Sequence, residues 1–549
     1  MQRFMLAKRA WVVLLVVVCA VYFYGLGSVP LLGPDEPRYA EVAREMYARG
    51  DWVTPRLGGH TWFEKPALIY WMMMATFRVF GVTEFAARAG SALAGVLTVL
   101  LTGWIARRAE LESGEGLRGF GVTCAVVMAS TLGLIVFARA ASFDVILTAT
   151  VTASLACFYG SEIERDERRR RKLLAGFYAC VGVSLLAKGL VGIVVPVGVV
   201  GLYYLLRREW PRKVGVVWGL PLCVAVAAVW YAPVIARNGW PFVDQFFIQH
   251  HFARYVSDKY HHAQPFYFYL PVILMLALPW TFFFVGGVAS LRETNVRAVD
   301  AASKLRVLAF AAVILPLLFF SASGSKLPGY VLPALPGAAL LACDRVHRYL
   351  RGVGGLLSMR LTGALALLLS AAGVAFLFFG VKPLGDEVRH VPNVCAVALV
   401  LPSALAGLAA LLFARKRWLC FLSIAGATLL TIPIIVNCAL GAVARGETMA
   451  NELRLAERQG LGALPVVNMY VVERTSEFYA AGRLAYDERG EPLNLQGAGE
   501  VADFAARHGG AALVIVPVKE EHQLQDEPRL EARLVGDNGR LALVFVRQK

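Results

Sequence analysis

The sequence predicts a polytopic α-helical membrane protein with about thirteen transmembrane helices and a soluble α/β domain at its C-terminus. Hydrophobic residues make up 58% of the 549 residues, more than the roughly 45–50% that is usual in soluble domains. Apolar runs long enough to cross a bilayer recur along residues 1–443,. After residue 443 this pattern stops, and short strand-like and helix-like runs alternate instead,.

A transmembrane helix needs roughly 20 apolar residues. The predicted spans lie near residues 10–32, 84–106, 119–138, 143–160, 173–187, 189–206, 214–235, 266–290, 306–321, 330–343, 361–381, 393–414 and 418–442. The run 66–80 is too short to span comfortably, so we expect an interfacial helix there,. The first run follows basic residues and has no evident cleavage site, which indicates an uncleaved signal anchor,.

Alternate loops differ in charge. One set is strongly basic, and by the positive-inside rule these loops face the cytoplasm. This set contains Lys8/Arg9, Arg107/Arg108, Arg168–Lys172, Arg207/Arg208/Arg212/Lys213, Arg292–Arg306, Arg345/Arg348/Arg351 and Arg415/Lys416/Arg417. These loops account for much of the net charge of +16. No nucleic-acid motif accompanies them, so we expect no nucleic-acid partner.

The other set of loops then faces outward and carries the unusual polar residues. Its longest members are the first loop, 33–83, and the loop 237–264; residues 139–144, 187–189, 321–330 and 382–392 complete it. An odd number of spans also places residues 444–549 outside. In that C-terminal region GDNGR, at 536–540, predicts a hairpin turn,. The region shows no catalytic constellation, so a structural cap over the active face is its expected role.

The nine cysteines all lie in or beside apolar runs, and none lies beyond residue 440. This distribution predicts no disulfide framework and no CxxC metal site. We interpret the cysteines as small core residues.

Two acidic residues stand where helix-like runs begin in the outward set. Asp35 precedes a run in which Pro37 suits the first helical turn and Gly50 suits the end,. Asp144 begins the span at 143–160. The alternatives are an N-cap role for Asp35 and an interfacial position for Asp144. The adjacent acids Asp35 and Glu36 are more than a cap requires. Ionisable residues within membrane spans are usually functional, so Asp144 is a functional candidate as well.

Cationic side chains are spread over several outward loops. They include Lys65, Lys188, Lys326, His250, His251, Arg254, His261 and His262. Each one alone is explained by snorkelling toward lipid headgroups. As a set on one membrane face they favour a site for a polyanion, because lysine and arginine bind phosphate. Glu64 and His250 could instead hold a divalent metal, although HH-x9-HH is not a recognised ligand spacing,.

An outward-facing enzyme has no access to cytoplasmic nucleotide sugars or ATP. If it transfers a group, its activated donor should arrive attached to a lipid. A polyprenyl phosphate is such a leaving group, and fixed cations would stabilise its developing charge without a metal. A lipid or ion transporter is the alternative from another class. It predicts inverted repeats and polar residues on both faces, and the sequence shows neither.

Three motifs carry a resemblance to a known family. They are DEPRYAEVAREMYARGDWVTPRLGGHTWFEKP, HHFARY with HHAQPFYFYLP, and FSASGSKLPGYVLPALP, in that order within roughly the first 340 residues. The chain resembles the GT-C membrane glycosyltransferases related to protein O-mannosyltransferases. Within these it is most similar to bacterial lipid A aminoarabinose transferases. The C-terminal region shows no motif that matches.

The resemblance implies a reaction and a place for it. The family moves 4-amino-4-deoxy-L-arabinose from undecaprenyl phosphate to lipid A phosphates on the periplasmic face of the bacterial inner membrane, which gives resistance to polymyxin and other cationic peptides. We therefore expect a multi-pass, monomeric enzyme that requires no cofactor, with a divalent metal still possible. Another polyprenyl-linked sugar, or a glycolipid or protein acceptor, is the alternative.

The resemblance also assigns residues. It makes Asp35 the key catalytic acid, with Asp144 a second acid near it. It implies that four side chains lie around the donor phosphate: Arg38, Lys65, Lys188 and Tyr330. Glu64, which precedes Lys65, is also a candidate for substrate binding. His251, Arg254 and Lys326 match motif positions and are assigned to substrate binding.

Overall fold

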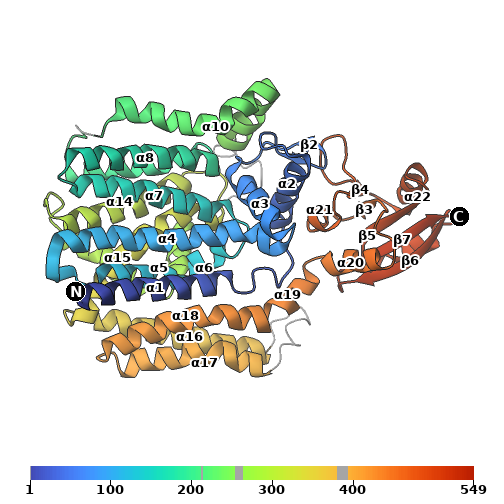
Figure 1. The fold of residues 1–549 in the computed structure, drawn as a ribbon. Coiled ribbons are helices and arrows are strands. Elements are labelled where there is room, and N and C mark those ends of the chain that lie inside the picture. The colour runs from blue at the N-terminus through green and yellow to red at the C-terminus, as the bar shows by residue number, and fades with distance from the viewer. Residues whose placement is uncertain (1, 212–213, 254–263, 380–392) are drawn as a thin grey trace.

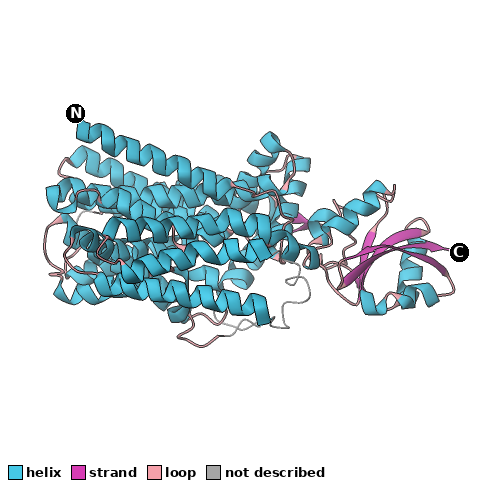
Figure 2. Cartoon of the chain, turned by 90° about the horizontal axis from the view of Figure 1, so that it is seen from below, coloured by secondary structure: helices cyan, strands magenta, loops and turns pink. Residues whose placement is uncertain are grey.

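The computed structural model describes residues 2–211, 214–253, 264–379 and 393–549. Long helices run side by side in a bundle, and a mixed β-sheet lies beyond one end of it (Figure 1). Seen from below, the sheet and its short helices form a separate unit at that end (Figure 2). The predicted polytopic helical fold with a C-terminal α/β domain is thus confirmed.

The helices of the bundle follow the predicted apolar runs. They are α1 Gln2–Phe23, α4 Glu84–Ser113, α5 Phe120–Ala129, α6 Leu132–Ala138, α7 Phe143–Ile163, α8 Glu167–Lys188, α9 Val191–Arg207, α10 Val216–Val243, α12 Tyr269–Leu276, α13 Thr281–Ala289, α14 Ala301–Ser321, α15 Leu335–Arg351, α16 Leu356–Phe379, α17 Asn393–Leu412 and α18 Arg417–Cys438. Among the described residues, six helices are long and apolar enough to cross a membrane, or eight if each of two bent pairs forms one span. The number of about thirteen spans stays a prediction, because the other runs form shorter or more polar helices.

Two predicted spans are broken helices. The run 119–138 bends by 60° between α5 and α6, and the run 266–290 bends by 118° between α12 and α13. The prediction of one continuous helix for each was wrong. The two breaks meet, and the Leu132 amide donates to the Leu278 carbonyl at 2.8 Å. Backbone groups freed by a break inside a membrane are tolerated when protein neighbours satisfy them, as they do here.

The first span is shorter than predicted. α1 ends at Phe23, and the chain from there to residue 34 is not helical, whereas the apolar run had indicated a helix over 10–32. Gly25 has a φ of 60°, a left-handed conformation that glycine adopts readily and that ends a helix.

The first outward loop is folded. It contains α2 Asp35–Arg49, the two-stranded hairpin of β1 Arg56–Leu57 and β2 His60–Thr61, and α3 Leu68–Phe80. The expected helix at 66–80 is therefore present as α3, and its interfacial position stays a prediction. α2 and α3 lie between the bundle and the C-terminal sheet (Figure 1).

The predicted loop 237–264 is partly helical. α10 continues to Val243 through a kink at Gly239, where φ is 60° and ψ is −145°. A π-helical segment, η2 Asp244–Ala253, follows it. The apolar residues around the kink form a cluster that includes Trp230, Phe242 and Phe246. The position of this loop outside the membrane stays a prediction. The half at 254–263 lies outside the described residues.

The basic loops gather at the end of the bundle opposite the sheet (Figure 1). Contacts join them to one another: Arg108 Nη2 lies 3.3 Å from Glu164 Oε2, and Arg207 Nη1 donates to the Val296 carbonyl at 3.0 Å. The alternation of basic and polar loops therefore corresponds to two ends of one bundle.

The C-terminal domain is a five-stranded sheet with short helices. Its elements are α20 Ala450–Arg458, β3 Val466–Met469, α21 Ser476–Tyr479, β4 Asn494–Leu495, α22 Ala498–Arg507, β5 Ala511–Pro517, α23 His522–Asp526, β6 Leu530–Asp537 and β7 Leu541–Gln548. The strand order is β4-β3-β5-β7-β6. β3 pairs in parallel with β4 and β5, whereas β7 is antiparallel to β5 and β6. The hairpin expected at GDNGR joins β6 to β7, and α19 Leu440–Gly446 crosses the expected domain boundary at 443.

A disulfide joins Cys395, near the start of α17, to Cys438, at the end of α18, with a Cα–Cα distance of 5.4 Å. The prediction that all cysteines are unpaired core residues was wrong for these two. They are 43 residues apart and meet only because α17 and α18 pack side by side. The other seven cysteines are free and buried or half-buried, as expected of small core residues.

Candidate active site

The first loop is anchored to the bundle by Glu36. Its Oε2 accepts from Arg88 Nη2 at 2.7 Å, and its Oε1 accepts from Arg88 Nε at 3.0 Å and from the Ala141 amide at 2.6 Å. Arg88 also donates to the carbonyls of the non-helical segment after α1, at Leu26 and Val29, both at 2.8 Å. One buried ion pair thus ties α2 to α4 and to the turn before α7. Nothing in the sequence pattern indicated this pair, because Glu36 and Arg88 are 52 residues apart.

Asp35, the residue before Glu36, makes none of the hydrogen bonds that Glu36 makes. It is the first residue of α2 and is exposed, and the N-cap position belongs to Pro34. The N-cap interpretation of Asp35 is therefore wrong. No hydrogen bond or ion pair of the Asp35 carboxylate is found among the described residues. A helix N-terminus favours negative charge, so the first turn of α2 suits the Asp35 carboxylate.

Asp144 and Lys188 form an ion pair through Oδ1 and Nζ. Asp144 lies in the first turn of α7, and Lys188 is the last residue of α8, where a cation is favoured by the helix dipole,. The Lys188 ammonium also lies 4.3 Å from the ring centroid of Tyr330. Gly329 packs so closely on Asp144 that a Cβ there would overlap Oδ2. The structure therefore brings together three residues that the sequence placed in separate outward loops.

Asp35 and Asp144 lie at the starts of two helices, α2 and α7, that contact each other. Glu36, next to Asp35, binds the Ala141 amide in the turn before α7. The ring of Tyr39 packs edge-on against Phe143, with centroids 4.5 Å apart. The start of α2 and the start of α7 are thus in direct contact.

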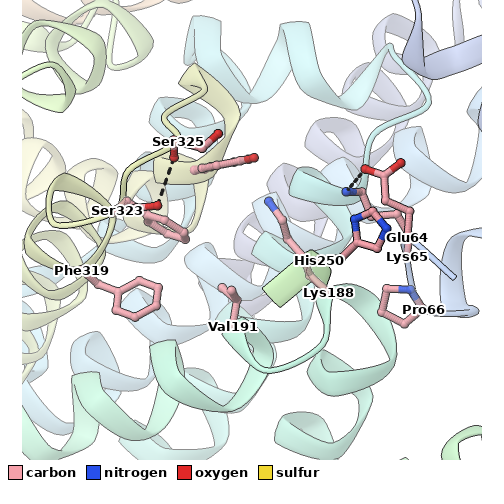
Figure 3. A pocket seen from close by; sticks show the side chains of 11 residues that line it. Glu64, Lys65, Pro66, Lys188, Val191, His250, Phe319, Ser323 and Ser325 are labelled. Carbon is pink, nitrogen blue, oxygen red and sulfur yellow. Dashed lines mark hydrogen bonds and ion pairs between the residues drawn. The ribbon is translucent and has the colours of Figure 1, made fainter. Parts of the chain in front are cut away.

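A cavity of about 90 Å³ opens beside this ion pair. It is lined by Glu64, Lys65, Pro66, Lys188, Val191, His250, Phe319, Phe320, Ser323, Ser325 and Tyr330. Glu64, Lys65 and His250 stand on one side, Phe319 and the two serines on the other, and Lys188 with Val191 between them (Figure 3). The volume is that of a few water molecules at ~30 Å³ each, which suits a small headgroup fragment rather than a whole lipid.

Two cations flank the cavity. Lys65 Nζ lies 2.8 Å from Glu64 Oε1 and 5.9 Å from the ring centroid of Phe143. Lys188 reaches the cavity from the end of α8. Both ammonium groups are paired with a carboxylate, so an incoming phosphate would meet two lysines whose positions are already set. Fixed cations of this kind stabilise charge that develops on a leaving group.

Arg38 is not among the residues that line the cavity. Its Nε is 3.4 Å from Glu477 Oε2, on α21 of the C-terminal domain, and its guanidinium lies 5.3 Å from the ring centroid of Trp62. Burial raises the pKa of Glu477, while Arg38 and Arg474 lower it, and the net shift is upward. Nothing in the sequence pattern of the C-terminal domain indicated Glu477, because its partner is more than 400 residues away.

Three predicted binding residues are not seen to face the cavity. The Lys326 ammonium is buried and donates to the carbonyl of Ser323 at 2.6 Å. It therefore holds the loop that presents Ser323 and Ser325 to the cavity. The side chain of His251 and all of Arg254 lie outside the described residues. The two serines were missed by sequence reasoning, although they belong to the SASGSK motif.

The described residues at the site do not form a group that could hold a metal ion. Glu64 and His250 line the same cavity, but the Glu64 carboxylate is bonded to Lys65. Within the described ranges, no three His, Cys, Asp or Glu side chains are grouped so that they could hold a metal ion. Whether the enzyme requires a divalent metal stays a prediction.

Comparison with known proteins identifies the family. The model of the dolichyl-phosphate-mannose-protein mannosyltransferase family matches residues 9–253. The undecaprenyl phosphate-α-4-amino-4-deoxy-L-arabinose arabinosyl transferase of Pseudomonas aeruginosa is 33% identical over 426 residues, which cover 75% of this chain and 73% of that protein. The chain belongs to this arabinosyl transferase family. The Edwardsiella ictaluri member is 34% identical over 382 residues, or 68% of this chain and 66% of that protein.

Solved structures agree with this family. The crystal structure of ArnT from Cupriavidus metallidurans bound to undecaprenyl phosphate superposes with a TM-score of 0.76 at 26% identity, covering 97% of this chain and 98% of that one. The archaeal oligosaccharyltransferase AglB from Archaeoglobus fulgidus, at a TM-score of 0.52 and 12% identity, shares the fold alone. The matched segments span 62% to 66% of the first three arabinosyl transferases compared. The resemblance that the motifs indicated is therefore confirmed.

Proposed function

We propose that this protein transfers 4-amino-4-deoxy-L-arabinose from undecaprenyl phosphate to phosphate groups of lipid A. The observation that carries the proposal is the cavity lined by Lys65 and Lys188. The fold around it matches that of ArnT bound to undecaprenyl phosphate. Family membership supports the same donor, because the relatives are named for it.

The reaction is a displacement at the anomeric carbon of the sugar. An oxygen of the acceptor phosphate forms the new bond to this carbon, and the bond to the donor phosphate breaks. The electron pair of the broken bond leaves with undecaprenyl phosphate, so negative charge grows on the leaving oxygen. Lys65 and Lys188 would stabilise that charge, and Tyr330 would hold Lys188 in place,.

Asp35 has a different task from Asp144. Asp144 is neutralised by Lys188, whereas Asp35 is exposed and unpaired among the described residues. An acceptor phosphate is already ionised near pH 7, since the second pKa of a phosphate monoester is about 6. Asp35 therefore need not remove a proton. It would orient the acceptor, or stabilise the cationic amine and the developing positive charge of the sugar.

The site would face the periplasm, together with the C-terminal domain. The basic loops lie at the opposite end of the bundle (Figure 1), which by the positive-inside rule is cytoplasmic. The disulfide at the start of α17 and the end of α18 supports this orientation, because disulfides persist in oxidising compartments such as the periplasm,. Addition of an amino sugar to lipid A phosphates would lower the negative charge of the cell surface and weaken the binding of cationic peptides.

The direct test is reconstitution. Purified protein in lipid vesicles is supplied with undecaprenyl phosphate-linked aminoarabinose and lipid A, and mass spectrometry follows the mass of lipid A. We expect one added aminoarabinose per modified phosphate. Lys188→Met should lower the rate by about 100-fold, the scale of losing one group that stabilises transition-state charge.

A matched lysine provides the control. Lys304 donates to the carbonyl of Glu162 at 2.7 Å, at the other end of the bundle. Lys304→Met should leave the transfer rate within about twofold of the wild type, as expected for a group remote from the reacting atoms. Absence of transfer from any lipid-linked sugar by the wild-type protein would refute the proposed function.

A further inference from the structure

Arg38 is placed between the C-terminal domain and the start of α2. Burial lowers the pKa of the Arg38 guanidinium, but the negative charges of Glu477, Glu64 and Asp35, together with Tyr39, raise it by more, and the net shift is upward. The ion pair that the structure records is the one with Glu477, at 3.4 Å. Asp35, three residues before Arg38 on the same helix, has no ion pair among the described residues.

The geometry of α2 alone does not explain why Arg38 pairs with Glu477 and not with Asp35. Residues three apart on a helix face one another, and an acid and an arginine at that spacing ordinarily attract. Asp35 and Arg38 have this spacing in the first turn of α2. A competing attraction must therefore hold the guanidinium elsewhere, and Glu477 supplies it from outside the helix.

Glu477 is built into the domain interface. Its side chain is fully buried, and its second oxygen accepts from Arg474 Nη1 at 2.8 Å. The neighbouring residues of α21 also dock on the membrane part. The Phe478 carbonyl accepts from Arg44 at 3.1 Å, and the Tyr479 hydroxyl accepts from the Leu31 amide at 2.7 Å. The Glu477 carboxylate thus has a defined position relative to α2.

We propose that Glu477 is a positioning residue of the active site, which holds Arg38 on the side of the C-terminal domain and thereby leaves the Asp35 carboxylate free for substrate. This inference rests on the proposed function. It gives the C-terminal domain a task beyond covering the site: α21 keeps the candidate catalytic acid unpaired.

The test measures Asp35 itself and does not depend on transfer. Purified full-length protein is treated with a carbodiimide and glycine ethyl ester, which modify accessible carboxylates, and mass spectrometry gives the labelling rate of Asp35. In Glu477→Gln, Arg38 is released toward Asp35, and we expect labelling to slow by at least about twofold, the scale of one helical ion pair. In Glu477→Gln with Arg38→Gln, labelling should return to the wild-type rate.

Arg474→Gln is the matched control, since Arg474 binds Oε1 of the same carboxylate, whereas Arg38 lies beside Oε2. It should label at Asp35 like the wild type. An unchanged rate in Glu477→Gln, or equal slowing in Arg474→Gln, would overturn the inference. If Glu477→Gln does not fold, Glu477→Asp replaces it, because one methylene less draws the carboxylate away from Arg38, and the same outcomes apply. Failure of the proposed function would appear separately, as a wild-type protein that transfers no sugar.

Discussion

Asp144 and Lys188 show how a charged pair is tolerated beside a membrane. A single lysine at the end of an apolar helix is costly, and so is a lone acid at the start of another. Together they form an ion pair in which each lowers the cost of burying the other,. The pair also leaves Lys188 facing the cavity with a fixed orientation. Asp35 has no such partner among the described residues, which separates the tasks of the two acids.

The first prediction concerns Asp35. We expect Asp35→Asn to lower transfer to a hydroxyl acceptor by about 100-fold or more, the usual contribution of a general base. The loss should be smaller with lipid A phosphate, which is already ionised. Initial rates with the two acceptors measure the difference, and the unfolding temperature should match that of the wild type. An equal and complete loss with both acceptors would contradict this division of labour.

The second prediction concerns Gly329. An added Cβ at this position overlaps Asp144 Oδ2, so Gly329→Ala should displace the carboxylate from Lys188. We expect the transfer rate to fall by about 10- to 100-fold, because a shift near 1 Å can cost ~100-fold. Gly426→Ala is the control, since nothing lies within 4 Å of a Cβ there. Similar rates for both variants would show that the close contact with Asp144 is unimportant.

At the scale of elements, Glu36 and Arg88 connect segments that are far apart in the sequence. The pair joins the start of α2 to α4, to the non-helical segment after α1 and to the turn before α7. The broken helices also connect distant segments, since a backbone hydrogen bond joins the start of α6 to the break between α12 and α13. The acids therefore lie on helices whose relative positions are determined by buried polar contacts.

The third prediction concerns Glu36→Gln. Burial raises the pKa of Glu36, but Arg88 and two backbone amides lower this pKa by more than burial raises it, so the net shift is downward. The ionised form thus stabilises the fold above the usual glutamate pKa of about 4.3, and this contribution is lost as the pH falls through the lowered value. We expect Glu36→Gln to cost about 3–5 kcal/mol of stability at pH 7, as for a broken buried pair.

Thermal unfolding between pH 3 and pH 8 would measure this difference, which should be constant above about pH 5 and shrink in acid. The control is Glu112→Gln, because Glu112 pairs at 3.8 Å with Arg165, whose side chain is 92% exposed. That variant should change stability by less than about 1 kcal/mol. Equal effects of the two substitutions would argue against the anchoring role of Glu36.

The two ends of the helical bundle differ in charge and in the structures they carry. One carries the basic loops, and the other carries the cavity, the folded first loop and the C-terminal domain (Figure 1). Glu477 and Tyr479 connect that domain to α2 and to α4, since the Tyr479 hydroxyl donates to Glu84 Oε1 at 3.1 Å. The domain thus shares its interface with the site.

The fourth prediction concerns orientation. Arg489 is exposed on the C-terminal domain, and Arg168 is exposed at the basic end. A membrane-impermeant maleimide should label Arg489→Cys in cells whose outer membrane has been opened. Arg168→Cys should be labelled only after lysis. The reverse pattern would place the cavity in the cytoplasm and remove the argument for a lipid-linked donor.

Much of the architecture could be predicted from local patterns. Apolar runs located the helices of the bundle, basic residues marked one end, and GDNGR marked the β6–β7 hairpin. Of the candidate residues in the first loop, Glu64 and Lys65 line the cavity, and Lys188 lines it from the end of α8. The breaks at Thr131 and Pro279 were not predicted, because an apolar run looks the same whether its helix is straight or bent.

The sequence by itself determined which segments are apolar and which loops are basic, because hydropathy and charge are properties of neighbouring residues. Only the tertiary structure decided the partners: Asp144 with Lys188, Cys395 with Cys438, and Arg38 with Glu477. These pairs are separated by tens to hundreds of residues. Their attraction depends on distances of a few ångströms, which exist only after the helices have packed.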